Sequence, residues 1–196
     1  MDIKHFIVGP LLTNCYLLIS KDEAVVIDPG GGVKTILKEI EESGAKLKYI
    51  ILTHGHWDHT FSAPKIKKET RAKILIYEAE KEFVKFEVDK FLKDGDEIKI
   101  GNSFLKVIHT PGHTKGSICL LGENEIFTGD TIFKDGYGRT DLKGGSQKDL
   151  ENSLKKLSKI LKPGSLKLRF ISRLAPLRGT RRMKVYPGHG ETFEIE

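Results

Sequence analysis

The chain has 196 residues, 38% of them hydrophobic and 31% charged, which excludes a disordered chain and allows one sizeable hydrophobic core. No apolar run reaches the length of a membrane span, and the first residues lack the basic-then-apolar pattern of a signal peptide. The cysteines, Cys15 and Cys119, lie in apolar runs without Cys-x-x-Cys spacing, which indicates buried thiols. These features predict a cytoplasmic protein without a membrane partner.

The net charge of +6 is local, because residues 165–183 carry basic side chains and no acidic ones, and they account for all of it. The remainder of the chain is therefore balanced in charge, which disfavours a nucleic-acid partner for the protein as a whole. Lysine and glutamate are plentiful and Gln147 is the single glutamine, a balance that leans towards a thermophilic source.

The first half of the chain begins with short strands over residues 3–8, 15–20 and 23–28, rich in β-branched and apolar side chains. A helix follows from Val33 and ends at Ser43-Gly44. The apolar run 47–52 predicts an inner strand covered on both faces. The next expected elements are a helix over 62–69, a strand over 73–77 and a helix over 78–85.

The second half repeats the order of strands followed by a helix. Two hairpins are predicted, one pairing 97–100 with 103–109 and the other pairing 117–121 with 125–128. A glycine-rich loop over 135–145, a helix over 150–161 and a last strand over 184–186 complete it. Two sheets packed face to face with helices outside would bury these apolar faces, an α+β sandwich in a single domain over 1–196.

The stretch 53–59, Thr-His-Gly-His-Trp-Asp-His, directly follows the predicted strand 47–52. Imidazole suits zinc, iron, copper or nickel, and a carboxylate adds negative charge and can orient a water. A solvated loop rarely collects three histidines and an aspartate in this order. The stretch therefore predicts the first half of a metal centre.

Three further candidate ligands also follow predicted strands. His113 lies in Thr-Pro-Gly-His-Thr, His189 in Pro-Gly-His-Gly, and Asp130 in Gly-Asp-Thr. Glycine beside each of these residues lets the backbone turn tightly and leaves room for a ligand. Every candidate ligand thus falls where a strand gives way to a loop, so one edge of a sandwich would collect them.

These motifs together resemble the metallo-β-lactamase-fold hydrolases. The combination comprises His-x-His-x-Asp-His over 54–59, Thr-Pro-Gly-His-Thr over 110–114, Gly-Asp-Thr over 129–131 and Pro-Gly-His-Gly over 187–190. Within that family the chain is most similar to the short glyoxalase II-type (hydroxyacylglutathione hydrolase-like) branch. The resemblance implies a four-layer αββα sandwich, with two mixed sheets flanked by helices and a two-metal site at one edge.

Carried over to this chain, the resemblance implies that one metal is held by three histidines and a second by an aspartate and two histidines, with Asp130 bridging both. The two metals, most readily zinc with iron or manganese as alternatives, would share a hydroxide of lowered pKa that attacks an acyl carbon. Asp58 and Asp130 are the carboxylates expected to act in catalysis. The implied sets are His54, His56 and His113, then Asp58, His59 and His189.

Other residues are candidates for supporting roles. Asp28, in Ile-Asp-Pro-Gly, matches a family position and would hydrogen-bond a ligand histidine, or would simply initiate a turn. Lys134, Tyr137 and Arg139, in the loop that contains Gly-Arg-Thr-Asp, would contact an anionic substrate. Arg139 would equally serve as a buried partner of a carboxylate.

The chain departs from the family pattern in its C-terminal part. The sequence continues for seven residues after His189, and we therefore expect the helical domain with which longer glyoxalase II enzymes bind glutathione to be missing. Residues 165–183 form a basic insertion before the last strand, predicted to be an irregular surface loop.

The expected activity is hydrolysis of a small thioester or ester, including an anionic one. The alternative is a persulfide dioxygenase, which resembles this sequence through the same ligands and Gly-Arg-Thr-Asp but uses one iron and consumes oxygen. A lactonase and an RNA-processing hydrolase are further alternatives from the same fold.

Overall fold

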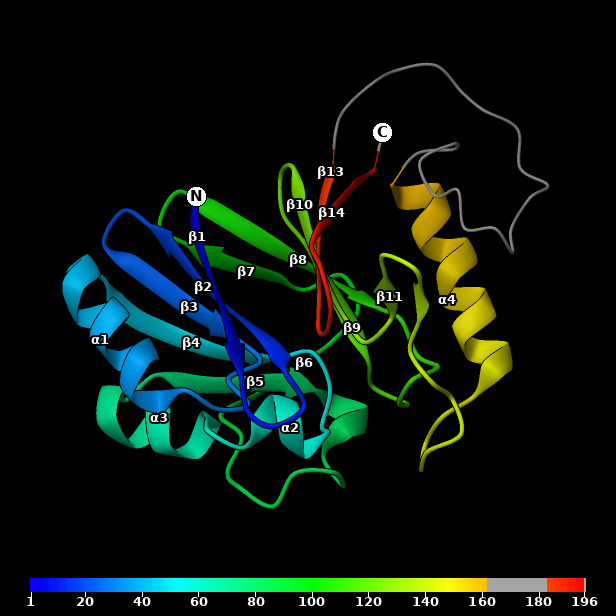
Figure 1. Ribbon diagram of the computed structural model, residues 1–196, viewed down its shortest axis with the longest axis horizontal. Helices are drawn as coiled ribbons and strands as arrows, with labels where there is room; N and C mark the ends of the chain where they lie inside the picture. Colours follow the sequence, from blue (N-terminus) through cyan, green and yellow to red (C-terminus); the bar gives the residue numbers. More distant parts are fainter. Residues whose placement is uncertain (162–182, 196) are drawn as a thin grey trace.

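The computed structural model describes residues 1–161 and 183–195, which form two six-stranded sheets packed face to face (Figure 1). The basic insertion predicted for 165–183 lies outside the described residues, except for its last position. None of the helices in the described part of the chain is long and apolar enough to cross a membrane.

The first sheet is mixed. Its first three strands form an antiparallel meander, and the next three run parallel to β3. The predicted inner strand is confirmed as the central β4, where the side chains of Ile50 and Ile51 are fully buried on opposite faces. In spatial order the strands are β1 (Asp2–Val8), β2 (Thr13–Ser20), β3 (Glu23–Ile27), β4 (Lys46–Leu52), β5 (Lys73–Tyr77) and β6 (Lys90–Leu92).

The second sheet is also mixed, with β13 parallel to β10 and its other neighbouring strands antiparallel. Both predicted hairpins occur in it. A separate two-stranded sheet of β11 (Ile132–Phe133) and β12 (Gly136–Tyr137) directly follows β10 in the chain. In spatial order the strands of the second sheet are β14 (Phe193–Ile195), β13 (Met183–Pro187), β10 (Glu125–Gly129), β9 (Ile118–Leu121), β8 (Ser103–His109) and β7 (Glu97–Ile100).

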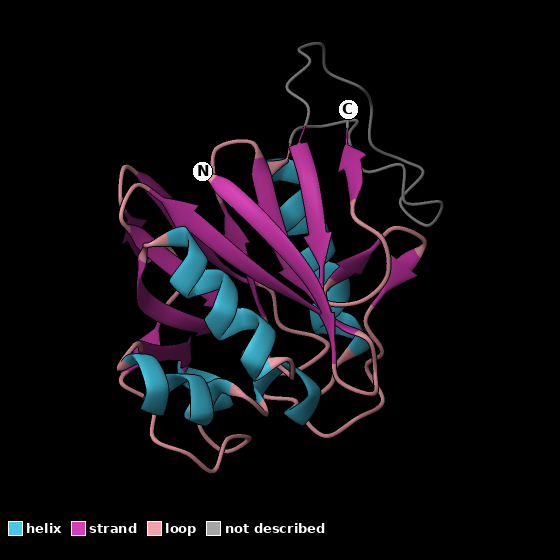
Figure 2. Cartoon of the chain, turned by 60° about the vertical axis from the view of Figure 1, so that its left-hand side comes forward, coloured by secondary structure: helices cyan, strands magenta, loops and turns pink. Residues whose placement is uncertain are grey.

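Helices cover both outer faces, α1 (Val33–Ser43) and α3 (Ala63–Thr70) on the first sheet and α4 (Gln147–Ile160) on the second (Figures 1 and 2). Three separate clusters of buried apolar side chains fill the spaces between these layers. The described residues thus confirm the predicted α+β class and the αββα order. Burying each large aliphatic side chain of this kind contributes roughly 1.5–3 kcal/mol.

The helix predicted over 78–85 is wrong. Only a single 3-10 turn, η1 (Glu78–Glu80), forms there. Beyond it Val84, Phe86 and Val88 pack against the first sheet while the residues between them face solvent. This spacing of two suits extended chain rather than helix, and it leads into β6, which the sequence patterns missed.

One edge of the sandwich collects the C-terminal ends of several strands. In the first sheet β3 and β4 run in the same direction, and in the second sheet β8, β10 and β13 do. The two edges are joined where the amide of Ile118 donates to Thr53 O at 3.0 Å and the amide of Asn14 donates to Gly188 O at 2.7 Å. The loops that follow all five strands therefore meet.

Candidate metal centre

The stretch 53–59 leaves β4 as a loop and then enters a short helix, α2 (Trp57–Thr60). His54 lies in the loop, and Asp58 and His59 lie on the helix, all three of them buried. The helix lies very close to the loop that follows β3. A Cβ built on Gly30 in that loop would lie only 1.4 Å from Asp58 O. A glycine at this position lets the backbone approach that closely.

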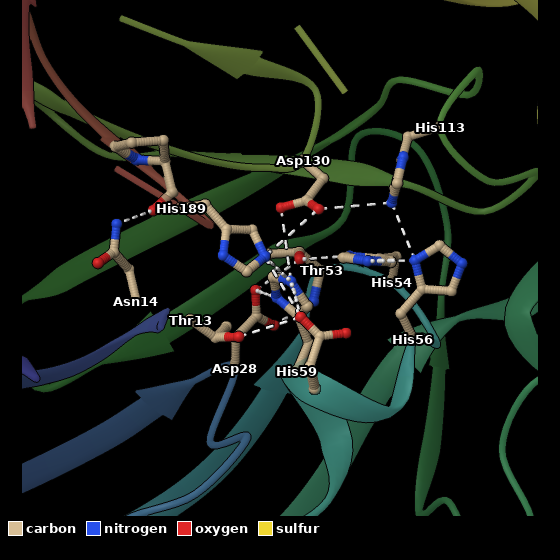
Figure 3. A network of polar contacts seen from close by, with 12 residues as sticks. Thr13, Asn14, Asp28, Thr53, His54, His56, His59, His113, Asp130 and His189 are labelled. Atoms are coloured by element: carbon tan, nitrogen blue, oxygen red, sulfur yellow. Dashed lines mark hydrogen bonds and ion pairs between the residues drawn. The ribbon is translucent and has the colours of Figure 1, made fainter. Parts of the chain in front are cut away.

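The predicted ligands gather in a single cluster (Figure 3). Nδ1 of His56 lies 3.1 Å from Nε2 of His54 and 2.9 Å from Nε2 of His113. On the other side, Nε2 of His189 lies 3.2 Å from Nε2 of His59 and 3.2 Å from Oδ2 of Asp58. Each of these groups of three offers ligand atoms within 4.8 Å of one another. The structure thus groups the side chains in the sets that the family resemblance implied.

The Asp130 carboxylate lies between the two sets. Its Oδ2 is 3.5 Å from Nε2 of His113, and its Oδ1 is 3.4 Å from Nε2 of His59. Asp130 directly follows β10, and Gly129, with φ of 47°, turns the chain at the end of that strand. The two oxygen atoms of Asp130 thus face one histidine of each set.

Four histidines are oriented by hydrogen bonds on the side of the ring that faces away from the cluster. Nδ1 of His59 lies 2.9 Å from Oδ2 of Asp28, and Nδ1 of His54 lies 3.2 Å from the Thr53 hydroxyl. Nδ1 of His113 donates to a backbone carbonyl at 2.7 Å, and Nδ1 of His189 to another at 3.1 Å. A neutral imidazole that donates through Nδ1 presents an unprotonated Nε2, the form that binds a cation.

Asp28 connects two of these supports. Its Oδ1 accepts the Thr53 amide at 2.7 Å, and its Oδ2 accepts the Thr53 hydroxyl at 2.6 Å as well as facing His59. Asp28 adopts a left-handed backbone, φ 50°, that aspartate tolerates better than most residues. Both roles predicted for Asp28 therefore fit one geometry, a turn residue that hydrogen-bonds a histidine of the cluster.

The two sides of the cluster differ in their electrostatics. Burial, followed by the neighbouring histidines, lowers the pKa of His54 well below its usual value and that of His56 to about 4. Burial also opposes the charged form of His59, but Asp130, Asp28 and Asp58 outweigh it and raise its pKa to about 9. His54 and His56 therefore offer neutral imidazoles, whereas the surroundings of His59 are rich in negative charge.

The cluster fits divalent cations. Ring nitrogen atoms of neighbouring histidines lie 2.9–3.2 Å apart. A neutral imidazole has one N–H and one lone pair, and four of these histidines donate that N–H away from the cluster, so too few protons remain between the rings to pair every lone pair. Oδ1 of Asp130 is buried and, among the described residues, has no hydrogen-bond partner. Neutral imidazole and carboxylate are ligands that zinc, iron and manganese accept, so either set of three with Asp130 would hold such an ion.

The three predicted substrate residues, Lys134, Tyr137 and Arg139, lie in and around β12 and have different surroundings. Lys134 and Tyr137 line an open hollow of about 580 Å³ beside His189, and the ammonium of Lys134 pairs with Glu191. The Arg139 side chain is exposed and forms a bidentate pair with Asp141, at 2.6 and 2.7 Å. A buried role for the Arg139 guanidinium is therefore wrong, although its carbonyl is the group that accepts from His113.

Sequence patterns missed several supporting groups. The hydroxyl of Thr13 donates to Oδ2 of Asp58 at 3.0 Å, and the carbonyl of Leu11 accepts from His189. The side chain of Asn14 fixes the His189 loop by donating to the carbonyls of Pro187 and Gly190, each at 2.9 Å. Backbone carbonyls have no residue-type signal, and only Thr13 and Asn14, at the start of β2, could have been recognised as polar residues in an apolar strand.

Fold and cluster define a class of protein in which one edge of an αββα sandwich presents a cluster of histidine and aspartate side chains that could hold metal ions. The metallo-beta-lactamase superfamily model matches residues 8–168, and the chain belongs to this family.

Individual relatives agree with this assignment. The chain is 33% identical over 206 residues to a probable metallo-hydrolase of Methanocaldococcus jannaschii, covering 91% of this chain and 88% of the relative. It is 30% identical over 179 residues to the probable polyketide biosynthesis zinc-dependent hydrolase BaeB of Bacillus velezensis, covering 89% and 72%. Among solved structures it is similar to the BLEG-1 B3 metallo-beta-lactamase, with a TM-score of 0.83 and 25% identity over 98% of this chain and 94% of that one.

Proposed function

We propose that this metallo-hydrolase cleaves thioesters, in the manner of hydroxyacylglutathione hydrolases. The observation that carries the proposal is the carboxylate of Asp130, buried between two convergent ligand sets with one oxygen unpaired among the described residues. Such a centre is suited to activating water, and no side-chain nucleophile is needed. Both cysteines are buried with a raised pKa, which removes them as candidates.

Two divalent cations held by these ligands would supply a water of lowered pKa and would polarise the substrate carbonyl. The protein residues orient the reactants. Burial opposes the charge of Asp58, yet hydrogen bonds from His189 and Thr13 and the nearby His59 keep its pKa below the usual range, so that it stays an anion that can orient the attacking water.

The hollow beside His189 would receive the substrate. It is open to solvent and lined by aromatic and charged side chains, among them Phe133, Lys134, Tyr137 and Glu191. Lys134 would attract an anionic group of the substrate by exchanging its surface ion pair with Glu191, which costs little because the pair is solvated. A small anionic thioester fits these features.

The test is a panel of thioesters, lactones and persulfides assayed with the metal-loaded protein, with metal content measured on the same sample. We expect thioester hydrolysis to be the fastest reaction, with two ions per chain, and to fall at least about 100-fold in His56→Ala and Asp130→Asn. Asp141→Asn, which alters an exposed ion pair, is the control and should keep wild-type turnover. One iron per chain with oxygen consumption on a persulfide would replace the proposal with a dioxygenase.

A further inference from the structure

Four acidic side chains are buried among the described residues, Asp28, Asp58, Asp130 and Glu80. The first three belong to the metal centre described above. The carboxylate of Glu80 forms its hydrogen bonds with backbone amides rather than with side chains of the ligand cluster, and the proposed chemistry makes no use of it. It lies in η1, directly after β5, and is fully buried.

The carboxylate of Glu80 joins the two loops that carry the first ligand set. Its Oε2 accepts the amide of Gly55 at 2.7 Å, and its Oε1 accepts the amide of Gly116 at 2.6 Å. Gly55 lies between His54 and His56, and Gly116 lies three residues after His113. One loop leaves the first sheet and the other leads into the second, so a single side chain spans both sheets at the site edge.

The packing around the Glu80 carboxylate leaves no room for a side chain at Gly55 or Gly116. A Cβ built on Gly55 would lie 2.8 Å from Oε2 of Glu80 and 2.4 Å from Cβ of Phe83. A Cβ built on Gly116 would lie 2.6 Å from Cγ of Glu80. Both glycines thus let the backbone reach the carboxylate directly.

The two amides are the groups that stabilise this buried charge. Among the described residues, no basic side chain forms an ion pair with Glu80 within 4.0 Å. A buried carboxylate is strongly unfavourable unless it is hydrogen-bonded, so the Gly55 and Gly116 amides must stay where Glu80 holds them. The distance between the two loops is fixed by the span of one carboxylate.

We propose that Glu80 is a positioning residue for the first cation site. By holding the Gly55 and Gly116 amides it keeps His54 and His56 at a fixed distance from His113, whose Nε2 lies 2.9 Å from Nδ1 of His56. The second set, Asp58, His59 and His189, has no hydrogen bond to Glu80. The inference rests on the proposed metal centre but not on the identity of the substrate.

Glu80→Gln is the most informative substitution. A glutamine amide has one oxygen and one NH₂ group, so it can accept from only one of the two backbone amides and sets a donor against the other. The size of the side chain is retained, and the protein should therefore fold. Loss of a partner that orients metal ligands typically weakens metal binding about 10–100-fold, and we expect about tenfold here because one hydrogen bond remains.

The test measures Zn²⁺ affinity at each site separately, by competition with a chromophoric chelator. The His189→Ala protein reports on the first site and the His56→Ala protein on the second. We expect Glu80→Gln to weaken Zn²⁺ binding about tenfold in the His189→Ala background and less than twofold in the His56→Ala background. The control is Glu23→Gln, since Glu23 also accepts a glycine amide of the other sheet, Gly101 at 2.8 Å, but at the end of β3 away from the site.

Equal weakening at both sites would show that Glu80 acts only on general stability and would overturn the inference, as would unchanged affinity at the first site. Absence of Zn²⁺ binding by the unaltered protein would overturn it as well. If a double variant does not fold, chelator dialysis of the single Glu80→Gln protein decides, because selective loss of one ion supports the inference and loss of both or neither contradicts it. Failure of thioester turnover alone contradicts the proposed function and leaves these affinities interpretable.

Discussion

Replacing Asp28 with asparagine tests how the cluster is supported. The carboxylate of Asp28 accepts the amide and the hydroxyl of Thr53 and lies 2.9 Å from Nδ1 of His59. Asparagine has nearly the same shape and tolerates the left-handed backbone at this position, so the substitution changes hydrogen bonding with little backbone strain. The effect can therefore be assigned to the side chain.

The size of the effect follows from counting the bonds. An asparagine whose oxygen keeps the Thr53 amide places its NH₂ group where Oδ2 was. The Thr53 hydroxyl can turn and accept from it, but Nδ1–H of His59 cannot. One hydrogen bond to a charged group is lost, about 1.5–3 kcal/mol. Because His59 is then free to change tautomer, metal affinity should fall about 10–100-fold.

Two measurements check this expectation. Urea unfolding of the metal-stripped protein gives the free energy of unfolding, and chelator competition gives the metal affinity. The control Asp141→Asn removes an exposed carboxylate and should change neither quantity. If Asp28→Asn matches wild type in both, the orientation of His59 does not depend on Asp28 and the reasoning is refuted.

Further predictions concern the packing, the thiols and acid stability. Gly30→Ala would place a Cβ 1.4 Å from Asp58 O, so we expect a loss of about 3 kcal/mol in urea unfolding, and wild-type stability would show that the loop yields easily. Cys15 and Cys119 are buried, and burial raises the pKa of both thiols, that of Cys119 to about 11. A thiol reagent should therefore label them only on unfolding, and rapid labelling of the native protein would contradict this burial. Burial alone would raise the pKa of Asp89. Hydrogen bonds from the Lys67 ammonium and the Ile74 amide nevertheless lower this pKa overall. The stabilisation by Asp89 is thus present above its unfolded pKa of about 4 and is lost as the pH falls through its lower folded pKa. Asp89→Asn should therefore cost about 1 kcal/mol at pH 7 and progressively less as the pH falls below about 4, and a cost that does not fall with pH would refute the assignment.

The sequence predicts the candidate ligands where residue types that bind metals follow the end of an apolar strand. His113, Asp130 and His189 each follow an apolar strand with glycine beside them, and the structure brings them to one edge because β8, β10 and β13 run in the same direction. Residue type, glycine spacing and strand pattern are all local signals. They predict which side chains gather, and the repeated burial pattern predicts two sheets packed face to face with helices outside, whereas the four-layer αββα order came from the family resemblance.

Other features could not be predicted because they depend on contacts distant in the chain. The carbonyls of Leu11 and Arg139 orient His189 and His113, and a carbonyl carries no residue-type signal. The sequence around Glu80 predicts a helix, and the burial of its carboxylate becomes visible only where the Gly55 amide approaches it in the structure. The alternation of apolar residues over 84–88 indicates an extended chain, but the polar residues before it favour a helix, and the prediction of a helix over 78–85 followed them.

The central claim is that these side chains hold two hydrolytic cations, and metal quantification on the purified protein tests it most directly. We predict two divalent ions per chain in the unaltered protein, and one each in His56→Ala and His189→Ala, because each substitution removes a ligand from only one set. A protein that retains no metal after desalting, or variants that keep the wild-type content, would contradict the account.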